Sequence, residues 1–350
     1  TDRTNYYEDI PSNAVELALF LESDRMGYLL DAMSPSKVDG QRDVVKNERR
    51  QSYENRPYGM SWIVLSENLY PKGHPYSWST IGSMADLSAA SYDDVVQFFK
   101  SYYVPNNASI VIAGDIDPAR VKALAEKWFS DVPAGKPVEP ADPAAAYLAE
   151  EKRLMFEDRV QIPRLYMTWL TPAYFTPGDA EMDVLASILA SGKNSRLYKR
   201  LVYDLQIAQD VSAFQSSAKL ASSFVIMATA RAGHTLGELE KIILEEIDKV
   251  KAEDPSVREV ARAVNQYEAS FLNGLETNGG KADQMNGYFM RTGNPDYFNE
   301  DLSRYKSLSP ADIRAVAQTY LSSSGRVVLS IVPQGKKELA AASSKEVKPQ

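Results

Sequence analysis

The stretches SYDDVVQFFKSYYVPNNASIVIAGD (residues 91–115) and SPADIRAVAQTYLSSSGRVVLSIVP (residues 309–333) decide the fold class. Each begins with a Ser followed three residues later by an Asp, which is the pattern of a helix start, and each continues through apolar positions into a β-branched run. A helix that leads into a strand and recurs far along the chain predicts two related halves, each larger than a solenoid repeat. Equivalent positions differ by the same number of residues, as in the pairs Asp94 and Asp312, Tyr102 and Tyr320, and Ile110 and Val328. This constant difference in residue number is called the repeat offset below.

The rest of the chain alternates between helical and strand-like patterns. Strands are expected where β-branched and aromatic residues cluster between turn residues, and helices where apolar residues recur every three or four positions. The expected helices cover 13–33, 39–54, 94–103, 118–129, 179–190, 235–251 and 257–275, and the expected strands cover 109–113, 165–170, 211–217 and 223–230. This mixture predicts an α+β fold of two related halves, each a mainly antiparallel sheet with helices packed on one face.

Four segments follow from these patterns. Five Pro and Gly residues interrupt all periodicity between Val132 and Glu151, so residues 133–150 are interpreted as a linker. Residues 151–335 then form the second half, and residues 336–350, which lack an apolar stripe, form a solvated tail. Residues 1–132 are the latter part of the first half, and the repeat offset implies that about 86 residues of that half lie before Thr1.

Composition excludes several classes of function. The net charge of −8 makes a phosphate backbone an unfavourable partner, so nucleic acid binding is not expected. The chain has no Cys, and only two His, at positions 74 and 234, so a His-rich metal site or a Ser/His/Asp triad within it must use one of those two. His74 lies in a turn and His234 precedes a helix cap, and both are interpreted as surface or packing residues. No apolar run is long enough to span a membrane.

The helix expected at 39–54 carries the most informative carboxylate. Its predicted inward stripe runs through Val38, Gln41, Val44 and Val45 to Glu48. A buried carboxylate is costly unless it is paired, hydrogen-bonded or bound to a metal. From the spacing alone Glu48 is a partner in a structural ion pair, a metal ligand, or an exposed residue.

Several short motifs along the chain, one of them on this helix, form an ordered series. They are Asp2-Arg-Thr-Asn-Tyr-Tyr, Leu21-Glu-Ser-Asp-Arg-Met, Gln41-Arg-Asp-Val-Val-Lys-Asn-Glu, Gly73-His-Pro-Tyr, Pro105-Asn-Asn-Ala with Gly114-Asp115, Gly192-Lys-Asn-Ser-Arg-Leu-Tyr, and the terminal Val327-Val-Leu-Ser-Ile-Val. Together they extend over nearly the whole chain. In order and spacing they resemble the insulinase, pitrilysin and mitochondrial-processing-peptidase superfamily of inverzincin zinc peptidases.

The resemblance implies a zinc metalloendopeptidase subunit that hydrolyses peptides with a zinc-activated water. In that family an H-x-x-E-H helix provides two His ligands and a Glu base, and a later Glu is the third zinc ligand, a role that the resemblance gives to Glu48. The motif lies roughly seventy residues before that ligand in the family and is absent from this chain. The chain by itself is therefore expected to bind zinc weakly or not at all and to be inactive. The family often has a second Glu seven residues before this ligand, where it supports the metal site, and the matching residue here is Gln41.

The second half departs from the family at a substrate-binding pair. Family members often bring an Arg and a Tyr from this half, or from a partner subunit, to the substrate backbone, but the matching positions are Val202 and Gln209. We therefore expect a homodimer or heterodimer with a related subunit that carries the pair. A shifted alignment or a degenerate enzyme would explain the same substitutions.

The competing interpretation is a non-catalytic scaffold or partner subunit of a peptidase-like complex, as some members of the superfamily are. The missing His ligands favour it, whereas a carboxylate retained at Glu48 favours the enzyme. The family and the absence of Cys are compatible with a bacterial periplasmic or secreted protein, but the sequence does not identify the compartment.

Overall fold

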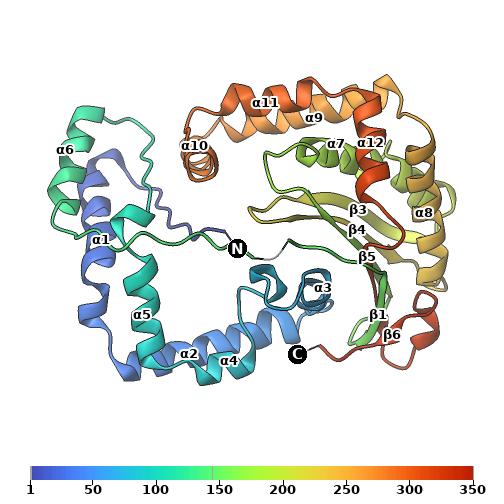
Figure 1. Cartoon of the computed structure of the whole chain (residues 1–350), viewed down its shortest axis with the longest axis horizontal. Coiled ribbons are helices and arrows are strands. Elements are labelled where there is room, and N and C mark those ends of the chain that lie inside the picture. The colour runs from blue at the N-terminus through green and yellow to red at the C-terminus, as the bar shows by residue number, and fades with distance from the viewer. Residues whose placement is uncertain (1, 144, 350) are drawn as a thin grey trace.

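The computed structural model describes residues 2–143 and 145–349. The N-terminal segment up to residue 143 is built from helices and extended connections, and the C-terminal segment from residue 145 contains the sheet and the largest hydrophobic core. Figure 1 shows the two segments side by side, with helix α3 (Ser61–Leu69) reaching from the first segment to the sheet of the second. The described residues contain no helix long and apolar enough to cross a membrane.

The sheet has six strands in the order β3-β4-β2-β5-β1-β6. The strands are β1 (Lys152–Asp158), β2 (Arg164–Thr171), β3 (Ala208–Ser216), β4 (Ser222–Ala230), β5 (Arg326–Pro333) and β6 (Lys345–Glu346). Strands β3, β4, β2 and β5 pair in antiparallel fashion, and β1 pairs in parallel with β5 and β6. The predicted antiparallel pair at 211–217 and 223–230 is thus confirmed as β3 and β4.

The main core lies between one face of this sheet and four helices. These are α7 (Asp179–Ala190), α8 (Leu236–Ala252), α9 (Val257–Gly274) and α12 (Pro310–Tyr320). Alternate residues of β2, including Met167 and Trp169, point into this core and are fully buried. The Trp169 indole Nε1–H donates to the carbonyl oxygen of Ser322 at 2.8 Å, so the largest core side chain keeps a hydrogen bond.

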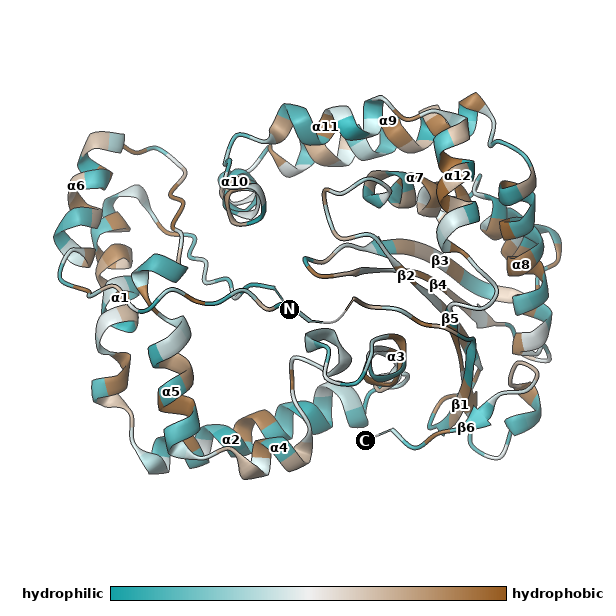
Figure 2. Cartoon of the chain, in the orientation of Figure 1, coloured by the Kyte–Doolittle hydropathy of each residue, from teal (hydrophilic) through white to brown (hydrophobic). Residues whose placement is uncertain are grey.

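The opposite face of the sheet is covered by a helix of the N-terminal segment. Val64, Leu65 and Leu69 of α3 are at most 3% exposed and form a second cluster with residues of β1, β2 and β5, among them Leu329. Figure 2 shows that α3 carries hydrophobic residues where it meets the strands. The prediction that helices pack on one face of the sheet is correct for the helices of residues 145–349. The other face is covered by α3, which belongs to the N-terminal segment.

The N-terminal segment contains α1 (Val15–Tyr28), α2 (Pro35–Arg49), α4 (Met84–Ala89), α5 (Tyr92–Tyr102) and α6 (Pro118–Phe129) besides α3. The strand predicted at 109–113 is wrong as an assigned element: these residues are extended but belong to no sheet, and Ile110 is 52% exposed. A strand requires a hydrogen-bonded neighbour, and the described part of this segment provides none.

The predicted duplication is visible in the order of the helices. Shifted by the repeat offset, α1, α2, α3, α4 and α5 overlap α8, α9, α10 (Asn278–Thr292), α11 (Phe298–Lys306) and α12 respectively, and α5 coincides with α12 over its whole length. Both members of this last pair begin with the predicted capping box, formed by Ser91 with Asp94 and by Ser309 with Asp312. Because β5 corresponds to residues 108–115, the unpaired extended segment occupies the place of a central strand.

The C-terminal residues differ from the expected solvated tail. Strand β6 pairs with β1, and the backbone N–H of Val347 donates to the carbonyl oxygen of Met155 at 2.8 Å. Ala341 is 3% exposed and belongs to the main core. The tail is ordered because it satisfies backbone groups at the outer edge of β1.

Candidate functional site

Helix α2 carries the predicted zinc ligand, and its limits follow from local chemistry. The Ser34 side chain accepts a hydrogen bond from the backbone N–H of Lys37, and Pro35 occupies the first helical position. The helix then runs to Arg49 and continues as a π-helical turn, η3 (Arg50–Glu54). The expected helix at 39–54 is therefore confirmed, with an earlier start.

The face of α2 that turns inward differs from the prediction. Glu48 is exposed and Val44 is 56% exposed, whereas Arg49 is only 1% exposed. The guanidinium of Arg49 donates to Glu54 Oε1 at 3.1 Å and to the carbonyl oxygen of Gly82 at 2.5 Å. These bonds turn the residue after Glu48 toward the protein, and the carboxylate points to solvent.

The internal repeat gives Glu48 a counterpart, Gln266 on α9. The Gln266 amide Nε2 donates to Ser191 Oγ at 3.1 Å, immediately after the last residue of α7. In the second half this position therefore reaches the C-terminal end of the helix that fills the core. The described residues of the N-terminal segment contain no helix equivalent to α7.

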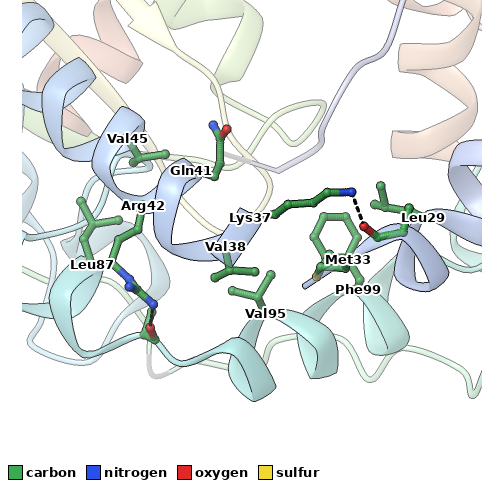
Figure 3. A pocket seen from close by; sticks show the side chains of 12 residues that line it. Leu29, Met33, Lys37, Val38, Gln41, Arg42, Val45, Leu87, Val95 and Phe99 are labelled. Atoms are coloured by element: carbon green, nitrogen blue, oxygen red, sulfur yellow. Dashed lines mark hydrogen bonds between the residues drawn. The ribbon is translucent and has the colours of Figure 1, made fainter. Parts of the chain in front are cut away.

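An apolar cavity of about 470 Å³ lies beside α2, toward its N-terminal end. Figure 3 shows Val38 and Val95 facing one another across it, with Met33 and Phe99 at one side. Two cations are held at its rim, since the Lys37 ammonium donates to the carbonyl oxygen of Ala32 and the Arg42 guanidinium to that of Ala90. The cavity is thus a hydrophobic space next to the helix that bears Glu48.

The two positions matching the family's substrate-binding pair are far from equivalent in their surroundings. Val202 lies in η6 (Tyr198–Asp204) and packs against the main core, so its side chain faces inward. Gln209 is exposed on β3, a strand at the edge of the sheet. The structure therefore brings no Arg and Tyr pair together at these positions.

The two histidines have structural roles, as predicted. His74 is 4% exposed, stacks on Tyr70 and accepts a hydrogen bond at Nδ1 from the backbone N–H of Tyr76, and burial lowers its pKa. His234 contacts the Glu238 carboxylate at 3.3 Å, next to the capping box that Thr235 forms with the same Glu.

A buried polar cluster in the second half was missed by the sequence analysis. The Arg304 guanidinium lies 2.9 Å from Asp179 Oδ2 and 3.4 Å from Asp301 Oδ1, and the Tyr305 hydroxyl donates to Asp183 Oδ2 at 2.8 Å. Burial raises the pKa of Asp183 to about 7. The only sequence signal was the pair of Asp residues four positions apart on α7, which become neighbours on one helix face.

The donor set of this chain does not fit a zinc ion. Structural and catalytic zinc sites use three or four protein ligands, and within residues 2–143 and 145–349 no group of three His, Asp or Glu side chains could hold a metal. Glu48 could provide one ligand only.

The comparison with protein families decides the assignment. The family model described as "Peptidase M16 inactive domain" matches residues 89–267, slightly more than half of the chain. The chain belongs to the peptidase M16 family. The matched region begins near the start of α5 and ends within α9.

Individual relatives of this M16 chain agree with the assignment. It is 24% identical over 341 residues to the zinc protease PqqE of Helicobacter pylori, a match that covers 95% of this chain and 74% of the relative. It is 23% identical over 328 residues to a probable mitochondrial-processing peptidase subunit beta of Schizosaccharomyces pombe, with coverages of 90% and 70%. The solved structure of a protease from Helicobacter pylori superimposes with a TM-score of 0.84 at 23% identity, over 92% of this chain and 77% of that one.

These findings confirm the predicted family and the α+β fold. They also associate the family with zinc, because relatives are named zinc proteases.

Proposed function

We propose that this chain is part of a zinc metalloendopeptidase subunit in which Glu48 is one zinc ligand. The other ligands and the general base would come from an H-x-x-E-H motif outside residues 1–350, so the chain alone is inactive. The observation that carries the proposal is the place of Glu48: it is exposed on α2, and its repeat counterpart Gln266 reaches the end of α7. A helix equivalent to α7 in the first half would therefore end beside the Glu48 carboxylate.

The surroundings of Glu48 leave its carboxylate available as a metal ligand. The described residues give its carboxylate no ion pair within 4.0 Å, although Arg49 and Arg50 follow it directly. Val44, one turn earlier, is 56% exposed. The Glu48 carboxylate is therefore accessible to a metal ion.

The second half is proposed to bind no zinc. At the position of Glu48 it has the amide of Gln266, which is a poorer zinc ligand than a carboxylate and is already hydrogen-bonded to Ser191. The division into a first half (1–132), a linker (133–150), a second half without zinc (151–335) and a C-terminal segment (336–350) accompanies this proposal.

We further propose peptides as substrates and a related subunit as partner. Val202 and Gln209 cannot reproduce an Arg and Tyr pair, so a related subunit in a heterodimer would supply it. A homodimer would have the same Val and Gln in both subunits and would bind the substrate backbone without the pair. One relative carries the name of a subunit, the beta subunit of a mitochondrial-processing peptidase, which is in keeping with a family that works in assemblies.

A second candidate function is a non-catalytic scaffold or partner subunit. The family model that matches is described as an inactive domain, and H-x-x-E-H is absent from the chain. Zinc content separates the two candidates.

The test compares this chain with a polypeptide extended upstream by about 90 natural residues. We expect only the longer form to hold one zinc ion and to cleave peptides from a mixed library. In the longer form Glu48→Gln should lower zinc affinity by about tenfold or more, whereas Asp43→Asn, an exposed change on the same helix, should not. A longer form without zinc would favour the scaffold, and unchanged zinc affinity in Glu48→Gln would refute the role of Glu48.

A further inference from the structure

The outer edge of β1 is covered by a very short part of the C-terminal segment. Strand β6 has two residues and pairs with Leu154 and Met155 only, whereas β1 has seven residues. Figure 1 shows β6 beside β1, at the edge of the sheet opposite to β3. An edge strand with free backbone N–H and C=O groups can pair with another chain, so its cover determines what this side of the sheet can bind.

The backbone groups that point out of the sheet belong to alternate residues of β1. The carbonyl oxygen of Met155 accepts a hydrogen bond from the backbone N–H of Val347, directly after β6, so Met155 faces outward. Successive residues of a strand direct their backbone groups to opposite sides, and Arg153 and Glu157 therefore face the same way as Met155. Among the residues described, no strand pairs with Arg153 or Glu157 on this outer side.

The segment that covers the edge is held in two different ways. Ala341 is 3% exposed and belongs to the main core, which anchors the chain up to this point. Beyond Ala342, Lys345 and Glu346 are exposed, and Ser343 has a φ of 59°, a conformation that residues other than Gly adopt only rarely. The residues after Ala342 can therefore leave β1 without disturbing the main core.

The sequence of β1, KRLMFED, is complementary to itself in the antiparallel direction. The basic residues Lys152 and Arg153 begin the strand, and the acidic residues Glu157 and Asp158 end it. In an antiparallel pair of two copies centred on Met155, Lys152 lies opposite Asp158 of the second copy. Arg153 lies opposite Glu157 in the same register. Opposite charges at directly opposed positions stabilise a strand pair, and two-fold symmetry repeats each of these contacts.

The same register suits the backbone and the apolar side chains. Met155 opposes its own copy and Arg153 opposes Glu157, so the residues whose backbone groups face outward form the hydrogen-bonded pairs of an antiparallel ladder. The remaining opposed pair, Leu154 with Phe156, is apolar and lies on the face that α3 covers. A two-fold axis perpendicular to the sheet keeps this face on one side in both copies. Charge, hydrogen bonding and hydrophobicity thus favour one register.

We propose that the outer edge of β1 is a dimerisation surface for a second copy of this chain, and that residues 343–349 cover it. Once this cover leaves β1, the sheets of two copies join edge to edge. The surface differs from the one at which a related subunit is proposed to supply an Arg and Tyr pair, because Gln209 lies on β3 at the opposite edge of the sheet. The inference does not depend on zinc or on Glu48.

Removal of the residues after Ala342 tests the cover, because the other surfaces of the chain stay the same. Sedimentation velocity compares the shortened chain with the 350-residue chain at equal concentrations. We expect the shortened chain to form a dimer with a dissociation constant lower by about tenfold or more. A shortened chain that associates no more strongly than the 350-residue chain would overturn the proposal.

Lys152→Glu in the shortened chain tests the pairing of charges. It places like charges opposite one another at both ends of the strand pair, so the dimer should weaken by about tenfold. Lys199→Glu is the matched control, because it makes the same charge change at an exposed residue of η6 and should leave the dimer unchanged. Equal weakening by both variants would show that association depends on net charge and not on β1, which would contradict the proposal.

A disulfide provides a measurement that keeps Lys152, whose ammonium also donates to the carbonyl oxygen of Asn68. The natural chain has no Cys, and Met155→Cys places the thiols of two copies opposite one another. The Cα atoms of such a hydrogen-bonded pair lie about 5.5 Å apart, which is within the range of a disulfide. We expect mild oxidation to link the shortened chain into a covalent dimer and to leave the 350-residue chain unlinked, because β6 occupies its edge. A shortened chain that stays unlinked would refute the register, and linkage at both lengths would refute the cover.

Discussion

The buried cluster around Arg304 predicts a stability that depends on the protonation of Asp183. Asp179 and Asp301 contact the Arg304 guanidinium, whereas Asp183 accepts a hydrogen bond from the Tyr305 hydroxyl. Burial raises the pKa of Asp183 from 3.8 to about 7. The folded protein therefore binds a proton that the unfolded chain has released between these pH values. The contribution of Asp183 to stability becomes less favourable as the pH rises from about 4 to 7 and is constant above that.

The size of the effect follows from the shift. At 1.36 kcal/mol per pKa unit, Asp183 lowers the free energy of unfolding by about 4 kcal/mol at pH 8 and by about 1.5 kcal/mol at pH 5. In Asp183→Asn the amide oxygen can still accept the Tyr305 hydroxyl, and no charge is buried. The variant should therefore gain about 3 kcal/mol over the natural protein between pH 5 and pH 8.

Urea unfolding of both proteins at pH 5 and pH 8 measures this difference. Asp248→Asn is a matched control, because that side chain is 75% exposed, and its effect should be small and independent of pH. If Asp183→Asn is no more stabilising at pH 8 than at pH 5, the pKa of Asp183 is not raised into this range in the folded protein, and the electrostatic reasoning is refuted.

Two further predictions concern the packing and the ion pairs. Leu65→Ala should lower the free energy of unfolding by about 3 kcal/mol, because Leu65 of α3 is 2% exposed against the sheet, and both segments should unfold together in urea. Leu17→Ala, at a residue 58% exposed, should lower it by less than about 1 kcal/mol. Hydrogen bonds from Arg196 lower the pKa of Glu259 to about 2, and the stabilisation that they provide is lost as the pH falls from 4.5 toward 2. Glu259→Gln should therefore lower the free energy of unfolding by about 2 kcal/mol at pH 7 and by little at pH 2. Thermal unfolding at the two pH values checks the second prediction, and an equal cost at both would contradict it.

The sequence determined the local structure of this protein and its duplication. The capping boxes at Ser91 and Ser309 were predicted and are present, because each depends on groups only three residues apart. The constant repeat offset predicted related halves, and the order of the helices agrees with it. The resemblance of short motifs identified the family that the comparisons confirm.

Tertiary structure decided which faces are buried. The stripe through Glu48 was predicted to point inward, but the bonds of Arg49 to Glu54 and Gly82 turn α2 so that Arg49 is buried instead. Spacing on a helix defines a face, and the partners far along the chain determine where that face points.

The same reason explains the remaining differences. Helix α3 covers a sheet that begins about 80 residues later, and residues 109–113 remain unpaired because a strand depends on its neighbours and not on its own β-branched residues. Asp179, Asp183 and Asp301 form a cluster only because α7 and α11 are packed together. Local hydrogen bonds can be read from a few adjacent residues, whereas burial and pairing are properties of the assembled fold.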